Sequence, residues 1–283
     1  MVRKMFFNFI KRSARSSASR LFTAAVVLCG IVFLLNAAFF DVRPSNLWGL
    51  TYGTLAAILM IGAALLGLQR RLTKLALKTG FGNAQSWLHV HLYGGALFLL
   101  LTFMHTGFRQ PHGILTWWLW FLSIWVTASG FLGVILQKWI PKLLTSGLAI
   151  EVVYERIPEL IQEIGEKVEA LLENCAPQSG VKDFYQKQIA MALVTPRPRL
   201  IYCIDITGGI QSRLKQFEYL RGFLPLTEKE NLNKLEALYK TKLEIDAHYT
   251  LQRLLRVWLY THVPASLVLL ILLGLHLFTV LYY

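Results

Sequence analysis

Four of the seven histidines form two pairs with identical spacing. His91 and His105 lie 14 positions apart, and so do His262 and His276. On an α-helix, which turns by about 100° per residue, fourteen positions fall about 40° short of four full turns. The two members of a pair therefore share one helix face, about 21 Å apart along the axis. Two such helices running parallel would bring the histidines together at two levels.

Imidazole pairs of this kind suit haem iron that only transfers electrons. Low-spin iron takes two nitrogen ligands and keeps no open coordination position, and histidines on rigid helices supply them. We expect one ligand pair at the inner level and one at the outer level, so that the chain holds two b-type haems. The predicted iron ligands are His91 with His262 and His105 with His276.

Other residues could accommodate the porphyrin and its propionates. Gly94 and Gly95 follow His91 by three and four positions, where the missing side chains let a flat ring approach the helix. Buried propionates need cationic partners, which arginines at the two levels could provide. The predicted cofactor-binding residues are Gly94, Gly95, Arg71 and Arg256 at the inner level, and Arg109 and His112 at the outer level.

Two further histidines leave alternatives open. His89 points about 160° away from the direction of His105 and reads as an interfacial residue, although an error of one turn would make it a rival ligand. His248 lies another 14 positions before His262 and could serve a third cofactor. We expect it not to do so, because no second ligand is visible for it.

The composition predicts that these helices lie in a membrane. Of the 283 residues 55% are hydrophobic and only 16% are charged, against roughly 25% charged in soluble domains, which excludes a soluble globular enzyme. Five runs are long enough for a bilayer core of about 30 Å. The predicted spans are Leu21–Phe40, Leu47–Leu68, Trp87–Phe108, Ile114–Leu136 and Val257–Leu281. The first run is too long for a typical signal peptide, so we expect a retained span.

Basic residues predict the orientation. The segment before the first span, the loop after the second and the stretch from Lys138 to Arg256 hold 27 of the 29 Lys and Arg residues, and the opposite side holds only Arg43 and Arg109. By the positive-inside rule, the N-terminus and the large insertion are cytoplasmic and the C-terminus is extracytoplasmic, in a bacterial or archaeal inner membrane. The N-terminal segment is amphipathic and is expected to lie along the inner interface.

The insertion between the fourth and fifth spans has a different composition, with 15 of the 16 acidic residues. Leu148–Arg156 and Arg199–Thr207 are rich in β-branched residues and predict strands, whereas 158–174 and 181–194 predict helices. A capping-box pattern after Pro225 predicts a long helix leading to the last span. The expected fold is therefore an all-α transmembrane bundle of five spans with an inserted small α+β cytoplasmic domain. The domain bounds are 1–20 for the basic segment, 21–137 for spans one to four, 138–253 for the insertion and 254–283 for the fifth span.

Several other chemistries find no support. The three cysteines have no CxxC spacing, so neither a thiolate metal site nor an attached c-type haem is expected. No dinucleotide or P-loop fingerprint occurs, and the basic residues read as facing solvent and lipid headgroups rather than nucleic acid. No Asp or Glu lies in a predicted span, which disfavours a proton-relay transporter.

The third and fifth predicted spans resemble the membrane cytochromes b. The paired His91-x13-His105 and His262-x13-His276 look like the four-histidine core of the cytochrome b/b6 family and of ferric-reductase-like membrane domains. The resemblance covers about half of the chain. It implies parallel ligand helices, two haems and electron transfer between them.

The chain departs from both groups. No PEWY-type quinol loop and no flavin domain is present in these 283 residues, and the inserted domain matches neither pattern. We therefore expect a dihaem subunit of a respiratory or electron-transfer complex. Its partners would be membrane lipid, an extracytoplasmic cytochrome or other redox subunit, and a cytoplasmic or quinone electron partner. The alternatives are a quinol dehydrogenase or metal reductase acting at one haem edge, and a histidine-based metal or proton transporter.

Overall fold

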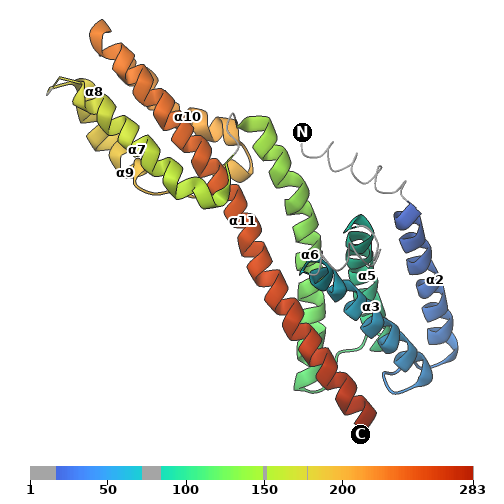
Figure 1. The fold of residues 1–283 in the computed structure, drawn as a ribbon. Helices are drawn as coiled ribbons and strands as arrows, with labels where there is room; N and C mark the ends of the chain where they lie inside the picture. The colour runs from blue at the N-terminus through green and yellow to red at the C-terminus, as the bar shows by residue number, and fades with distance from the viewer. Residues whose placement is uncertain (1–16, 72–83, 149–151, 177, 283) are drawn as a thin grey trace. The chain divides into compact units, whose positions relative to one another are not determined.

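The computed structural model describes residues 17–71, 84–148, 152–176 and 178–282 (Figure 1). Within these ranges the chain is helical and forms no β-strand. The α-helices are α2 (Ser17–Phe39), α3 (Leu47–Arg71), α5 (Ala84–His105), α6 (Ile114–Gly147), α7 (Ile157–Glu173), α8 (Gly180–Phe184), α9 (Ala190–Leu193), α10 (Ile206–Arg221) and α11 (Leu226–Tyr282). The basic N-terminal segment falls mostly on residues 1–16 and so lies outside the described part.

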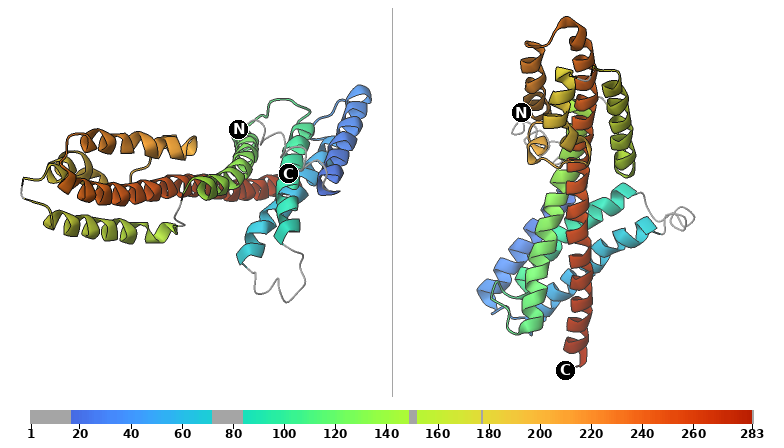
Figure 2. Two further views of the ribbon diagram at one scale, coloured as in Figure 1. Left: turned by 90° about the horizontal axis from the view of Figure 1, so that it is seen from above. Right: turned by 90° about the vertical axis from the view of Figure 1, so that its left-hand side faces the viewer.

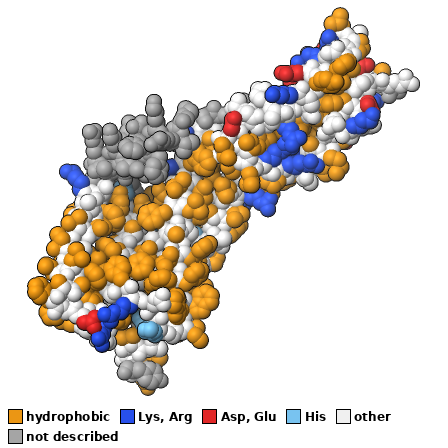
Figure 3. Space-filling model, turned by 180° about the vertical axis from the view of Figure 1, so that it is seen from behind, with side chains coloured by type: hydrophobic (Ala, Val, Ile, Leu, Met, Phe, Trp, Pro, Cys, Tyr) orange, Lys and Arg blue, Asp and Glu red, His pale blue; other side chains and the backbone are white. Residues whose placement is uncertain are grey.

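Five of these helices are long and apolar enough to cross a membrane, which confirms the predicted number of spans. They are α2, α3, α5, α6 and α11. Many of their large apolar side chains are exposed, as expected for surfaces that face lipid. Figure 3 shows hydrophobic side chains covering these helices on one face of the molecule. The chain is a multi-pass membrane protein.

The described residues divide into two compact units. Unit 1 contains 17–132 and 261–282, and unit 2 contains 133–260. Helices α6 and α11 contribute residues to both units. Unit 1 therefore consists of α2, α3, α5, the first part of α6 and the last part of α11.

The core of unit 1 is built from α3, α5, α6 and α11. Phe98, Leu101 and Met104 of α5 are buried in one apolar cluster with Leu269 of α11. Helix α2 joins this group through polar and aromatic contacts, because Asn36 Nδ2 donates to the Tyr52 hydroxyl of α3 over 2.8 Å. This core holds the helices that carry the paired histidines.

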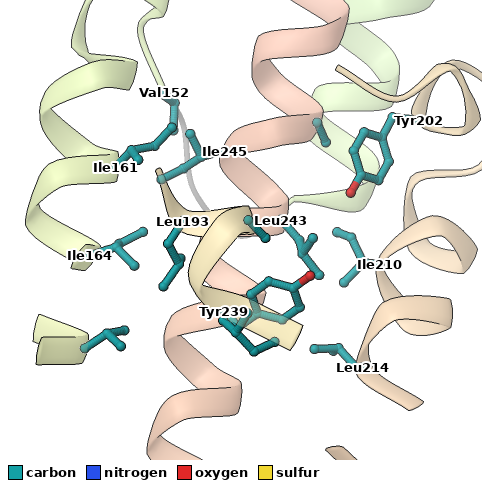
Figure 4. Close-up of a cluster of buried hydrophobic side chains, with 14 of the residues drawn as sticks. Val152, Ile161, Ile164, Leu193, Tyr202, Ile210, Leu214, Tyr239, Leu243 and Ile245 are labelled. Carbon is teal, nitrogen blue, oxygen red and sulfur yellow. The ribbon is translucent and has the colours of Figure 1, made fainter. Parts of the chain in front are cut away.

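Unit 2 is a helical bundle around the first part of α11. Helices α7 and α10 lie on two sides of α11 in both views of Figure 2. Figure 4 shows Ile210 of α10 beside Leu243 of α11, and Ile164 of α7 pointing toward Leu193 of α9. Tyr239 and Leu243 of α11 are buried in the same cluster. A fully buried ion pair, Lys242 Nζ to Asp246 Oδ2 at 2.7 Å, joins successive turns of α11 within this core.

The predicted α+β character of this domain is wrong. In the first expected strand, residues 154–156 form a 3-10 turn, and 149–151 lie outside the described residues. In the second expected strand, residues 200–203 form a 3-10 turn, and Ile206 begins α10. The backbone of both segments is bonded to side chains of α11 instead of to another strand. Gln252 Nε2 donates to the Val152 carbonyl, and the Arg199 N–H donates to Thr250 Oγ1. With their backbone polar groups satisfied in this way, the segments need no strand partner. Val152 and Ile206 pack into the helical core, whereas Val153, Ile201 and Ile204 stay exposed.

The predicted helices of this domain are present, and one more helix occurs. The expected 158–174 helix corresponds to α7, and the expected 181–194 run contains α8, a π-helical turn at 185–189 and α9. Helix α10 was not predicted. Its N-cap is Asp205, whose side chain accepts from the Gly208 N–H over 2.9 Å, so the Gly208–Gly209 pair lies in a first helical turn rather than in a loop.

Candidate functional site

The four spaced histidines meet as two pairs in unit 1. The ring centroids of His91 and His262 lie 6.3 Å apart with an interplanar angle of 76°. The rings of His105 and His276 have nearly the same arrangement, with centroids 6.4 Å apart and an angle of 76°. Each pair joins α5 to α11, so one geometry is repeated at two levels of the same two helices.

The separation within each pair matches two imidazoles on opposite sides of one metal ion. A metal bound by imidazole lies about 2.0–2.1 Å from the nitrogen, which lies about 1.15 Å from the ring centroid, giving a centroid separation of about 6.3–6.5 Å. Both observed separations fall in this range or at its edge. A separation of this size lies within the range of edge-to-face ring contacts and is also the spacing of two imidazoles that share one metal ion.

Three of the four imidazoles are held by hydrogen bonds at Nδ1. His91 Nδ1 lies 2.8 Å from the Ala63 carbonyl and His105 Nδ1 lies 2.8 Å from the Gly49 carbonyl, both on α3. Because a carbonyl can only accept, Nδ1 carries the hydrogen in each ring and Nε2 keeps its lone pair. A second partner of this kind is the usual means of orienting a metal-binding histidine.

His262 is held by a side chain instead of the backbone. Its Nδ1 lies 2.8 Å from Ser129 Oγ of α6. The serine hydroxyl donates to the Val126 carbonyl over 3.0 Å, so its oxygen is available to accept from the imidazole N–H. Among the described residues, no hydrogen bond to a ring nitrogen of His276 is formed. Two of the four imidazoles are thus held by backbone carbonyls and one by a serine hydroxyl.

Glycines let neighbouring helices approach the imidazoles. A Cβ placed on Gly53 of α3 would lie 2.7 Å from His105 Nδ1 and 2.9 Å from its Cε1, which no ordinary side chain tolerates. Gly53 lies one turn after Gly49, the residue whose carbonyl accepts from the same ring. On α6, a Cβ on Gly130 would make an ordinary contact of 3.6 Å with His262 Cε1. Sequence reasoning missed Gly53, because only the packed structure shows which ring it faces.

The two predicted porphyrin-facing glycines of α5 border open space. A Cβ on Gly95 would meet nothing within 4 Å, and one on Gly94 would meet only Leu59, at 4.0 Å. Gly274 of α11, two residues before His276, also meets nothing within 4 Å, but it is exposed on the helix surface. At Gly94 and Gly95, which are buried and half-buried, the missing side chains leave room beside His91 that a planar group could fill. The residues present therefore fit a haem.

The two levels are separated by apolar side chains. Phe98 lies seven residues from both His91 and His105, and Leu269 lies seven residues from the other two histidines. Both are buried in the same apolar cluster. No Asp or Glu of the sequence lies between the histidines of either pair. The α5 and α11 segments between the two levels therefore contribute no acidic side chain.

The donor set also distinguishes haem from a bare metal ion. Among the described residues, no three His, Cys, Asp or Glu side chains gather in a group that could hold a metal. Zinc sites use three or four protein ligands. A porphyrin provides four nitrogens of its own, so that two imidazoles complete the coordination of its iron.

The predicted arginine partners are engaged elsewhere or undescribed. Arg109 pairs with Asp41 Oδ1 at 2.7 Å, in the loop between α2 and α3, and Arg43 pairs with the same carboxylate. The hydrogen bond from Arg43 and the charge of Arg109 hold the pKa of Asp41 below its usual value. Arg256, in unit 2, pairs with Glu155 and lies over the ring of Tyr154. The side chain of Arg71 lies outside the described part.

The remaining histidines lie away from the two pairs. His89 faces Tyr93, with ring centroids 5.9 Å apart, and Tyr93 stacks on Phe22 of α2. His112 lies in the loop before α6, where its carbonyl accepts from the Thr116 hydroxyl. His248 is buried within unit 2, with Nδ1 3.5 Å from Gln252 Nε2.

No protein-family model, curated protein or solved structure matches this chain. The resemblance to the membrane cytochromes b therefore depends on the histidine spacing and on the geometry of the two pairs.

Proposed function

We propose that this chain is a dihaem cytochrome b subunit that carries electrons across the membrane between two bis-histidine haems. The observation that supports the proposal best is the repeated centroid separation of 6.3 and 6.4 Å in two histidine pairs that connect the same two helices. A single pair at this distance could be incidental. Two pairs related by 14 residues on both helices indicate two equivalent cofactor sites.

The protein's contribution in this proposal is to hold the four imidazoles in place. Helix α3 fixes His91 and His105 through two carbonyls, and Ser129 fixes His262. Each of these contacts leaves Nε2 as the coordinating atom. The four histidines would hold the two haems, which would supply one-electron redox chemistry at iron and so suit electron transfer.

Electrons that cross the membrane need a donor and an acceptor on its two sides. In this proposal the basic residues orient the chain as expected from the positive-inside rule, with the inserted domain in the cytoplasm of a bacterial or archaeal cell. An extracytoplasmic cytochrome or other redox subunit exchanges electrons with the His105–His276 level. Quinone or a cytoplasmic partner exchanges them with the His91–His262 level.

Single alanine variants test the proposal. His91→Ala and His262→Ala should each lose the same haem, and His105→Ala and His276→Ala should each lose the other, as measured by haem per chain and by redox titration of the absorbance bands. His89→Ala is the matched control, because this residue lies two positions from His91 and faces Tyr93. Loss of a haem in His89→Ala with retention of both in His91→Ala would refute the assigned ligands.

A further inference from the structure

Hydrogen bonds define the end of unit 2 that adjoins the apolar run of α11. The Arg197 N–H donates to Asp246 Oδ1, and two residues later the Arg199 N–H donates to Thr250 Oγ1. Over these residues the chain therefore runs along α11 toward its apolar part, and the 3-10 turn at Leu200–Cys203 follows directly. On another side, the Val152 carbonyl accepts from Gln252 Nε2. Both segments lie within two turns of Val257, where the apolar run begins.

Large apolar side chains are exposed at this end of the unit. Leu200 and Ile204 are 84% and 76% exposed, and Ile201 and Val153 are also exposed. These four residues form what we call the juxtamembrane patch. Val257 and Leu259 of the adjoining α11 turns are exposed as well, in agreement with the start of a lipid-facing surface. The patch and the first turns of the apolar run of α11 thus both expose large apolar side chains at this end of unit 2.

The charges around the patch favour an anionic surface. Arg156 and Arg253 are exposed near it, and Arg199 is half-buried beside Leu200. Among the described residues, the acidic groups at the same end are Glu155, Glu159 and Asp205. Glu155 is bound by Arg256, Glu159 lies 3.6 Å from Arg156, and Asp205 caps α10. Each of these carboxylates is thus engaged by a cation or a helix N-terminus. Of the arginines at this end, Arg253 lies over the Tyr249 ring, and neither Arg253 nor Arg199 forms an ion pair with the three carboxylates.

Apolar side chains set among guanidinium groups are the arrangement by which proteins sit in the interfacial region of a bilayer. We propose that the juxtamembrane patch is seated in the headgroup region of the membrane that the spans cross, with anionic phospholipid as its partner. The inserted domain is then fixed against the bilayer by Leu200, Ile201, Ile204 and Val153, as well as by its two connecting helices. This inference does not depend on the presence of haem.

A second exposed apolar group supplies the matched control. Tyr219, Phe223 and Leu226 lie at the other end of unit 2, where α10 leads into α11. Phe223 is 72% exposed, comparable to Ile204. Leu226 precedes Val257 by 31 residues of one helix, about 46 Å along the axis, so this end cannot reach the same bilayer surface along that helix.

Spin labels can distinguish lipid from water at the two ends. The full chain, with Cys29, Cys175 and Cys203 replaced by Ala, would carry a nitroxide at Leu200→Cys or Phe223→Cys in phosphatidylglycerol nanodiscs. The nitroxide at position 200 should be more accessible to oxygen, which concentrates in lipid, than to a water-soluble nickel complex. The ratio of its accessibility to oxygen over its accessibility to nickel should be several-fold higher than at position 223. Replacing phosphatidylglycerol by phosphatidylcholine should lower that ratio at position 200 only.

Equal ratios at the two positions would overturn the proposal, because the patch would then face water. Shielding of position 200 from both reagents would also overturn it, since a protein would then cover the patch. Hydrogen exchange of the wild-type chain gives an independent measurement that needs no cysteine replacement. Residues 199–205 should exchange several-fold more slowly in phosphatidylglycerol than in phosphatidylcholine nanodiscs, and residues 219–225 should not respond.

Discussion

Gly53→Ala should remove one haem and leave the other. The added Cβ would lie 2.7 Å from His105 Nδ1, whereas ordinary contacts begin at 3.4 Å, so the ring must move by about 0.7 Å (3.4 minus 2.7). Metal–ligand distances tolerate about 0.2 Å. The same movement would stretch the 2.8 Å hydrogen bond to the Gly49 carbonyl toward the limit of such bonds. We therefore expect loss of the haem ligated by His105 and His276, with the His91–His262 site intact.

The assay is haem per chain by pyridine haemochrome, together with a redox titration that counts the remaining components. Gly62→Ala is the matched control, because it lies in the same helix and its Cβ would meet nothing within 4 Å. Both substitutions increase helix propensity by up to about 1 kcal/mol, so a general loss of stability would not explain a difference between them. Two haems with unchanged potentials in Gly53→Ala would refute the packing argument.

Two further substitutions test the supports of the site and of unit 2. Ser129→Ala should retain two haems but raise the midpoint potential of one, because His262 loses the hydrogen-bond acceptor that makes its imidazole more basic. Ser129→Thr should restore the potential. Unchanged midpoint potentials in a redox titration of Ser129→Ala would exclude this role of the serine. Lys242→Met should destabilise unit 2 by about 3–5 kcal/mol, since it leaves Asp246 charged, buried and unpaired. A thermal melt followed by circular dichroism should show the loss, and adding Asp246→Asn should recover part of it; a melt unaffected by Lys242→Met would contradict the buried pair.

The helical spans, and the shared helix face of the two histidines within each span, follow from local pattern. Fourteen-residue spacing places His91 and His105 on one helix face whatever the rest of the chain does, and apolar runs of some twenty residues have few alternatives to a spanning helix. Both signals depend on periodicity within one element. The partners of the imidazoles do not, because the Ala63 carbonyl or the Ser129 hydroxyl lies near a ring only when separate helices have packed.

The inserted domain shows why local pattern failed. Arg199–Thr207 has the β-branched composition of a strand, but a strand needs a neighbour to accept its hydrogen bonds. Thr250 and Asp246 of α11 take that role for the segment around Arg199, and the chain turns into α10 instead. From a single sequence, a short β-branched run therefore cannot be assigned to a strand or to a turn that binds a neighbouring helix.

The measurement that tests the central claim most directly is the haem content of the detergent-purified chain, expressed with ample haem. A pyridine haemochrome assay and a reduced-minus-oxidised absorbance spectrum should give two b-type haems per chain. One haem per chain would mean that one histidine pair has been assigned wrongly. No haem would contradict the account, and the two pairs would then need another explanation for their 6.3 and 6.4 Å separations.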